Sequence, residues 1–535
     1  MGAVELPPAS PASATYRRRW WTLGILSMSL LIIGLDNTIL NVAIPTLQRE
    51  FSATATLLQW MVDAYILVFA GLLLLMGSLG DRYGRKRALQ VGLVVFGLAS
   101  FFAAFAQSSE QLIAARAVMG IGGALIMPST LSILTHVFPR EERGKAIGIW
   151  AAVAGLGIGL GPVTGGLLLE YFWWGSVFFI NVPIVAVALL AGLVLVPESR
   201  DPHPRSLDIL GAVLSISAVT VLVFSIIEAP VRGWTDGLVI AGFVVGAALM
   251  GAFIAWEIKT DHPMLNLDFF KNPRFSAGAG AISIGFFALF GMVFGLTQYL
   301  QFVQGFTPLE AGLRMLPVAV GMAMGAGLSH RIVGRVGSKR VVATGLVFVG
   351  GIMATIALWQ PDTSYVVIGV TFFCLALSMG NVMAPSTDAV MGAVPEANAG
   401  IASAMNDVTR QVSGAFGVAV IGSVINTAYS GRMDAAVAGL PPEAAEAASD
   451  SVGAASRIAS MLPDPVGAEL AAAADVAFTD ALGIAVLVSA GVAVAGSVLI
   501  ARYLPARHLP SVTPVESEHR GADSEVGEAP TVSPS

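Results

Sequence analysis

The chain has 535 residues, of which 55% are hydrophobic and only 12% are charged, about half the charged share of a typical soluble domain. This composition excludes a soluble globular protein and places the chain in the integral-membrane class. The formal net charge of −6 says little about partners, because in a membrane protein the placement of Lys and Arg matters more than their sum.

Fourteen apolar runs follow one another along the chain, each long enough to cross a bilayer as a helix. They cover residues 20–44, 57–79, 88–107, 111–136, 146–170, 176–196, 208–228, 238–258, 276–303, 310–330, 341–359, 365–388, 398–426 and 478–503. The first run directly follows three arginines and is too long for the core of a cleavable signal peptide. Residues 1–19 and 504–535 are polar or rich in Pro, Ala and Ser, so we expect both to be disordered.

Basic residues predict the orientation of these spans. Most of the 29 Lys and Arg residues fall in the two terminal segments and in alternate loops, and only Arg49, Arg232, Arg432 and Arg457 fall in the other loops. By the positive-inside rule both termini are cytoplasmic. A missed span would invert the alternation, so the pattern also supports the number fourteen.

Three local patterns recur in the same order about 255 residues later. They pair residues 80–87 with 334–340, residues 127–130 with 384–387, and Pro139, Gly144 and Gly161 with Pro395, Gly400 and Gly417. A duplication of this kind predicts an all-α integral membrane fold of two six-helix bundles with two inserted linker helices. The expected units are the N-terminal bundle (20–196), the linker region (197–274) and the C-terminal bundle (275–503).

Asp36 lies inside the first apolar run, well before Pro45. A carboxylate at that depth is costly unless it faces protein or water, which makes it a candidate functional residue; a solvated position near a helix end is the alternative. Asp63 and Arg116 lie at a similar depth in the second and fourth runs. A changing distance between Arg116 and a carboxylate would switch its affinity for protons, whereas a static structural ion pair is the alternative.

Asp407 and Arg410 lie three residues apart near the middle of the thirteenth run, so they share one helix face and can pair. That run is the repeat partner of residues 146–170, which predicts that Asp407 faces a central cavity. The segment 427–477 is long for an outside loop and is Ala-rich on both sides of Pro463 and Pro465. It suggests two short helices over the outer mouth, or a tolerated insertion.

Glycines form two further patterns. Gly157, Gly161 and Gly165 are spaced by four, so they present one smooth face that another helix can approach closely, and Pro162 permits a bend. Generic helix packing would also explain them. The loop after the second run combines glycines, one acid and several bases, which suits a tight turn and ion pairing as well as topology signalling. Its candidate gating residues are Gly77, Asp81, Arg82, Gly84, Arg85 and Lys86.

These motifs resemble those of the major facilitator superfamily. Residues 77–86 look like its motif A, residues 112–124 its motif B, and the series Gly157, Gly161, Pro162, Gly165 and Gly166 its antiporter motif C. Residues 35–45 resemble the helix 1 motif of drug:proton antiporters, and with fourteen spans the chain is similar to the drug:proton antiporter-2 family. Met119 departs from the usual Gln of motif B, and Gly334 replaces an acid in the second loop, which suggests unequal gating in the two halves.

The resemblance implies a proton-coupled exporter of amphipathic, often cationic, drugs that works by alternating access in a bacterial cytoplasmic membrane. We expect Asp36 and Asp63 to couple proton binding to transport and Arg116 to tune their affinity for protons. We expect Asp407 to meet the charge of the substrate or to take part in coupling. The driving force would be the proton motive force without a cofactor, and the monomer would be the functional unit. The alternative is a dedicated exporter of one natural product, lipid or siderophore. The six His residues form no ligand-spaced cluster and Cys374 is the only cysteine, so a metal site, a nucleic-acid partner or a membrane-embedded enzyme is not expected.

Overall fold

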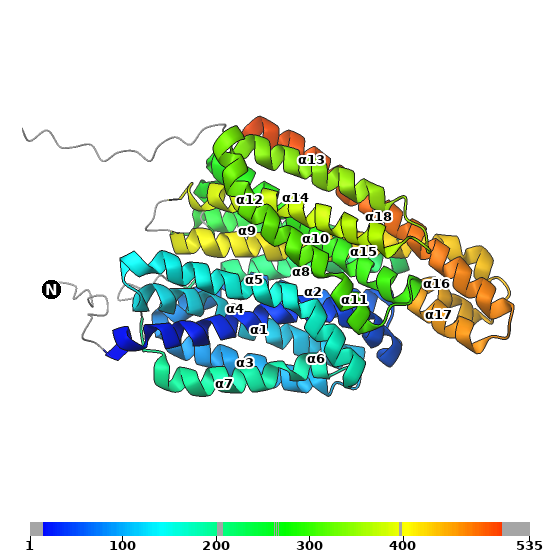
Figure 1. The fold of residues 1–535 in the computed structure, drawn as a ribbon, viewed down its shortest axis with the longest axis horizontal. Coiled ribbons are helices and arrows are strands. Elements are labelled where there is room, and N and C mark those ends of the chain that lie inside the picture. Colours follow the sequence, from blue (N-terminus) through cyan, green and yellow to red (C-terminus); the bar gives the residue numbers. More distant parts are fainter. Residues whose placement is uncertain are drawn as a thin grey trace, which may run out of the picture.

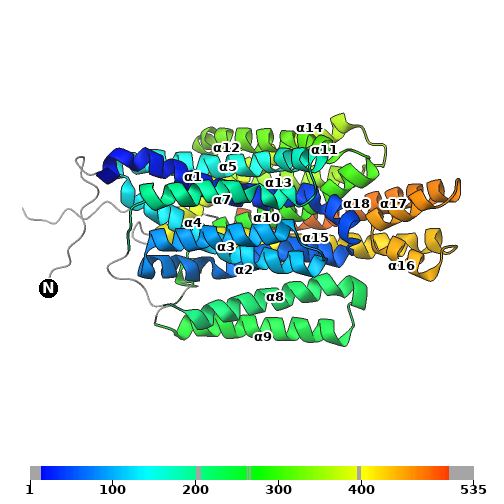
Figure 2. The same ribbon diagram turned by 90° about the horizontal axis from the view of Figure 1, so that it is seen from below.

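A computed structural model describes residues 14–200, 207–261, 263, 265, 267–394 and 399–504. Within these ranges the chain is helical and contains no strand. The long helices run side by side along the long axis of the molecule (Figures 1 and 2). Two short helices, α16 and α17, project from one end, which we call the cap end (Figure 1). The opposite end, where α1 begins and α18 finishes, is the terminal end.

Along the chain, two groups of helices are separated by a helix pair. The first group comprises α1 (Ala14–Phe51), α2 (Ala55–Tyr83), α3 (Arg85–Ala104), α4 (Ser109–Val137), α5 (Arg140–Tyr171), α6 (Ser176–Phe179) and α7 (Asn181–Leu195). The pair is α8 (Ile209–Arg232) and α9 (Gly237–Lys259). The second group comprises η1 (Leu267–Lys271), α10 (Pro273–Gln298), η2 (Tyr299–Val303), α11 (Pro308–Arg314), α12 (Leu316–Val336), α13 (Ser338–Ile356), α14 (Tyr365–Met391), α15 (Ala399–Val437), α16 (Pro442–Asp450), α17 (Val452–Met461) and α18 (Val466–Tyr503).

Thirteen helical stretches in the described residues are long and apolar enough to cross a membrane. In lipid a helix satisfies all its backbone hydrogen bonds internally, which is why runs of this length and apolarity fold this way. Each predicted span has a helix at its place. The helix α5 covers the remaining span and has 32 residues, but several of its side chains lie outside the described part of the chain.

Two large hydrophobic clusters fill the bundle. The first is centred on α1–α4 and α7 and also takes in residues of α8, α10 and α15; the second joins α10, α14, α15 and α18 with the cap helices and includes Val42 of α1. The pair α8–α9 lies on the outside of the bundle (Figure 2). There α8 packs against α2 and α15, so that the inserted pair bridges the two groups.

The two halves share one unusual backbone feature. Gly84 separates α2 from α3 with φ of 117°, and Gly337 separates α12 from α13 with φ of 84°. Residues that carry a side chain rarely adopt such backbone angles, so each turn requires glycine. These two glycines are aligned by the repeat, and they occupy equivalent turns in the two groups.

One predicted boundary is wrong, and two spans that lie at their predicted places are less regular than a single α-helix. The helix α1 begins at Ala14, so residues 14–19, predicted to be disordered, are helical; arginine is a good helix former and does not end a helix. Residues 1–13 and the tail from 505 onward lie outside the described residues. The run 276–303 finishes in the π-helical turn η2, and the run 310–330 is interrupted at Met315 between α11 and α12.

The segment 427–477 is also more helical than predicted. The helix α15 continues to Val437 and α18 begins at Val466, because the flanking Ala-rich sequence favours a helix. Two short helices do lie between them. They meet at Ser451, not at the predicted break near Pro463, and the hydroxyl of Ser451 caps α17 by accepting the N–H of Ala454.

Candidate functional site

Asp36 and Arg116 meet in the interior of the first group. Arg116 Nη1 donates to Asp36 Oδ2 at 2.5 Å, and both side chains are almost fully buried. The solvated alternative for Asp36 is therefore excluded. Removing two charges from water is costly, and their attraction offsets that cost only with close geometry. The other carboxylate oxygen of Asp36 makes no close hydrogen bond among the described residues, and the Asn181 side chain of α7 lies near the carboxylate.

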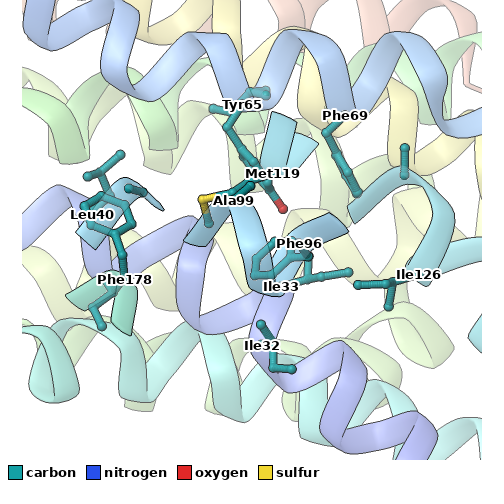
Figure 3. Packing of buried hydrophobic residues seen from close by; sticks show 14 of the residues in the cluster. Ile32, Ile33, Leu40, Tyr65, Phe69, Phe96, Ala99, Met119, Ile126 and Phe178 are labelled. Atoms are coloured by element: carbon teal, nitrogen blue, oxygen red, sulfur yellow. The ribbon is translucent and has the colours of Figure 1, made fainter. Parts of the chain in front are cut away.

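Two groups from α2 complete the surroundings of Arg116. Its Nε donates to the backbone carbonyl of Met61 at 3.2 Å, and its guanidinium carbon lies 4.4 Å from the centre of the Tyr65 ring. Tyr65 is itself stacked on Phe69, with ring centres 5.6 Å apart. Figure 3 shows Tyr65 and Phe69 beside Met119 in this core. Arg116 thus contacts a carboxylate, a carbonyl and an aromatic face at once.

Asp63 is fully buried as well, but it has no contact with Arg116 in the structure. Neither of its carboxylate oxygens has a hydrogen-bond partner among the described residues. Asp63 lies four residues from Gln59, which contacts α15, and four from Leu67, which lines a cavity together with residues of α8 and α15; this spacing places it on the face of α2 directed toward α15. The three residues predicted at one depth therefore separate into an ion pair and a lone acid.

The glycines of the motif C pattern pack against the helix that carries Asp36. A Cβ atom at Gly157 would lie 2.9 Å from the Leu31 carbonyl oxygen of α1, and one at Gly165 would lie 2.7 Å from the Ile39 side chain. Gly161 faces Thr38 in the same way. The smooth face predicted for α5 is thus in close contact with α1 over the turns around Asp36, as small residues allow.

The other side of α5 reaches the second group. Gly166 lies against the Pro308 carbonyl of α11, and Gly312 of α11 lies against the Pro162 carbonyl. Proline at position 162 stays within the helix. The motif C segment therefore contacts the Asp36 helix on one side and the opposite helix group on the other.

Asp407 and Arg410 pair within α15, as their spacing predicts. Arg410 Nη1 lies 3.7 Å from Asp407 Oδ1, and Nη2 donates to the Thr387 hydroxyl of α14 at 3.1 Å. The guanidinium carbon also lies 5.5 Å from the centre of the Phe286 ring. Both charged side chains are partly buried. This second polar cluster belongs to the second helix group and is separate from the Asp36–Arg116 pair.

The motif A loop is held by an ion pair and by two hydrogen bonds to carbonyls near the end of α7. Asp81 accepts from Arg85 Nε at 2.7 Å, Lys86 donates to the Leu193 carbonyl at 2.8 Å, and the Arg85 N–H donates to the Ser199 carbonyl at 2.9 Å. Arg82 lies over the ring of Tyr83. Gly77 lies close to Pro128 of α4, and Gly84 supplies the turn. Asp81 thus links α2 to α3.

The side-chain hydrogen bonds that join the two groups in the described residues all lie toward the cap end. Gln59 Nε2 donates to the Val418 and Ala419 carbonyls of α15, and Gln301 Nε2 donates to the Val42 carbonyl at 2.8 Å. From the cap, Arg457 donates to the Ser52 hydroxyl and to the carbonyls of Gln48 and Arg49, and the Ala55 N–H donates to Asp450. The cap end is therefore closed.

Several of these contacts were missed by the sequence interpretation. Gln59, Gln301 and Tyr65 are polar or amphipathic side chains inside apolar runs, and that position was the available signal. Arg457 stands out in the sequence only as one of four basic residues in the outside loops, which does not indicate a contact with α1. No group of three or more His, Cys, Asp or Glu that could hold a metal ion lies together in the ranges that the structure describes.

A polytopic helical bundle in two halves, with a buried ion pair beside a close helix contact, is the architecture of a membrane transporter. The Major Facilitator Superfamily model matches residues 26–418. The chain belongs to this superfamily, which consists of transporters and not of enzymes.

Proteins of known function and known structure are similar to the chain over most of its length. The chain is 36% identical over 499 residues to the multidrug efflux pump LfrA of Mycolicibacterium smegmatis, covering 93% of this chain and 98% of that protein. It is 34% identical over 415 residues to the tetracenomycin C resistance and export protein of Streptomyces glaucescens, covering 77% of each chain. A crystal structure of a bacterial homologue of the human lysosomal transporter Spinster has a TM-score of 0.64 at 18% identity, covering 92% of this chain and 99% of that one, which shows the shared fold.

Proposed function

We propose that the chain is a proton-coupled exporter of amphipathic, often cationic, drugs or toxic compounds. The observation that carries this proposal is the buried Asp36–Arg116 pair, held where α1 packs on the motif C glycines of α5. A carboxylate that exchanges a proton there would make or break the pair and so alter the packing of the first group. The similarity to a multidrug efflux pump over almost the full chain supports the drug substrate.

The topology that goes with this function has fourteen crossings. Thirteen apolar helical stretches plus α5 reach that number when α6 is counted with α7 and α11 with α12. We propose two six-helix bundles with α8 and α9 as linker helices, and a location in a bacterial cytoplasmic membrane. The distribution of basic residues supports placing both termini, and hence the terminal end, in the cytoplasm. The cap end then faces outward, and α16 and α17 cover the outer mouth.

In the transport cycle the two halves would rock about the substrate path, driven by the proton motive force and without a cofactor. Protonation of Asp36 or Asp63 would accompany drug release outside, and Asp407 with Arg410 would meet the charge of the substrate or take part in coupling. The motif A loop would hold α2 to α3 at the cytoplasmic end. We propose that one chain performs the cycle as a monomer.

A dedicated exporter of one natural product is the second candidate. It is favoured by the similarity to a protein named for resistance to a single compound, tetracenomycin C. Expressing the chain in an efflux-deficient bacterium and measuring resistance to a panel of unrelated compounds separates the two. Protection against several unrelated amphipathic cations supports the first function, and protection against one neutral compound supports the second.

The role of Asp36 gives the sharpest test of coupling. Asp36→Asn keeps an oxygen that accepts a hydrogen bond from Arg116 but removes the titratable proton. We expect normal amounts of protein in the membrane, no proton-driven ethidium efflux and no drug-induced change of pH in everted vesicles. Ethidium efflux at the wild-type rate in this variant would contradict the assignment.

A further inference from the structure

The Asp36–Arg116 pair joins two helix pairs that are each packed tightly. In one pair, α1 lies against the glycines of α5, as described above. In the other, α2 lies against two glycines of α4: a Cβ at Gly120 would lie 2.7 Å from the Tyr65 carbonyl oxygen, and one at Gly123 would lie 2.9 Å from the Phe69 ring. Close packing of this kind makes each pair move as a unit. Asp36 belongs to the first unit and Arg116 to the second.

The contacts of Arg116 are divided unequally between these units. The Met61 carbonyl and the Tyr65 ring both lie on α2, in the same unit as Arg116 itself. Only the bond to Asp36 crosses to the α1–α5 unit. If Asp36 becomes neutral, the guanidinium therefore keeps two of its three partners. An aromatic face attracts a cation more strongly where water is excluded, and this site is fully buried.

On the basis of the proposed proton-coupled function, we infer that Tyr65 is a positioning residue for Arg116. Its ring and the Met61 carbonyl hold the guanidinium on the α2–α4 unit throughout the cycle. Asp36, carried by the α1–α5 unit, is the partner that leaves when the pair breaks. Because α5 also contacts α11, this separation is passed on to the second helix group.

The surroundings offer Arg116 no other charged partner at this depth. The helices packed on α4 are chiefly α2, α3 and α1. On α2 the titratable groups are Tyr65, Asp63 and, at the opposite end of the helix, Asp81, Arg82 and Tyr83; Asp63 makes no hydrogen bond or ion pair with Arg116. Along α3 no titratable side chain follows Arg87, and along α5 none lies between Lys145 and Glu170. The Tyr65 hydroxyl has no hydrogen-bond partner in the described residues, so the ring, not the hydroxyl, is the group that acts.

A double-mutant cycle on thermal stability tests this division. Tyr65→Leu should lower the Tm of the purified protein modestly in the wild-type background, where Asp36 still holds Arg116. It should lower Tm clearly more in the Asp36→Asn background, where the ring is a main remaining partner. Tyr65→Phe keeps the ring and should restore the Tm in both backgrounds. Phe372→Leu removes an equally buried ring from α14 in the second helix group and should cost the same in both.

Equal losses for Tyr65→Leu in the two backgrounds would overturn the inference. If Tyr65→Leu does not fold with Asp36→Asn, phenylalanines with one, two or three ring fluorines at position 65 keep the shape and weaken only the attraction for the cation. The Tm of the Asp36→Asn protein should then fall stepwise with each fluorine, and a flat series would equally overturn it. These measurements need no transport, so ethidium efflux by the wild type judges the proposed function separately.

Discussion

At the scale of single residues, three acids inside the helix bundle differ in their charged partners. Asp36 has a charged partner at 2.5 Å, Asp407 has a looser one at 3.7 Å, and Asp63 has none among the described residues. An ionised carboxylate without a partner is the most costly of these arrangements in a dry interior. The structure thus stabilises the ionised form of Asp63 least, whereas the ionised form of Asp36 is stabilised by its bond from Arg116.

This difference predicts that removing the charge of Asp63 costs little stability. Asp63→Asn is nearly isosteric and breaks no hydrogen bond that the structure shows, so the free energy of unfolding should stay within about 1 kcal/mol of the wild type. If Asp63 carries a coupling proton, the variant should still bind drug but lose proton-driven efflux. Thermal unfolding of purified protein and drug transport in everted vesicles check the two parts. A large loss of stability would show that Asp63 has a structural partner instead.

At the scale of helices, the sequence predicts the order of the spans and the repeat, because apolar length and recurring glycines are local signals. It also predicts that Asp407 and Arg410 pair, since both lie on one helix. It places Asp36 and Arg116 at one depth but does not show their contact, because that depends on which faces of α1 and α4 meet. Tyr65 was missed for the same reason: an aromatic residue in an apolar helix looks like core until its neighbour on α4 is known.

The contact between α1 and α5 leaves no room for a methyl group at Gly157, and this can be tested. At Gly157 a methyl group would meet backbone atoms of α1, including the Leu31 carbonyl oxygen at 2.9 Å, and only a shift of the helix relieves that overlap. Gly157→Ala should cost about 1–3 kcal/mol, as overpacking does, and should impair efflux. Gly24 of α1 has no atom within 4 Å of such a methyl, so Gly24→Ala should be neutral or gain about 0.5–1 kcal/mol. Tm and ethidium efflux of the two variants compare them; equal effects would contradict the packing argument.

At the scale of the whole molecule, the cap end is closed by side chains that bind backbone groups across the two halves. Gln59, Gln301 and Arg457 each donate to carbonyls of the opposite half. The carbonyls that accept from Arg457 lie in the last turn of α1, where backbone groups lack partners within the helix. The carbonyls that accept from the two glutamines lie inside helices, and these neutral bonds can be broken without leaving a buried charge. A set of modest bonds therefore suits an end that has to open and close repeatedly.

Arg457 should be the strongest single contributor, since it makes three bonds across the halves, two to carbonyls and one to the Ser52 hydroxyl. Arg457→Ala should shift the molecule toward opening at the cap end. Spin labels at Gln107→Cys and Leu358→Cys, in a Cys374→Ser background, lie on opposite halves near that end and report it as longer distances. Arg432→Ala is the matched control, because it removes the same charge from the same region but breaks only contacts inside the second group, a pair with Asp480 and a bond to the Ala428 carbonyl. Equal distance changes in both variants would contradict the role of Arg457.

Asp450 should make this closure depend on pH. Burial raises the pKa of its carboxyl, with a further rise from nearby Glu446, while the hydrogen bond from the Ala55 N–H opposes the shift. A raised pKa means that the docked cap binds the proton more firmly than the undocked cap. Docking is then most stable below the ordinary pKa of an aspartate and weakens as pH rises through the raised value. The label distances should lengthen with rising pH in the wild type. Asp450→Asn should remove that dependence, whereas an unchanged pH profile would assign it to another group.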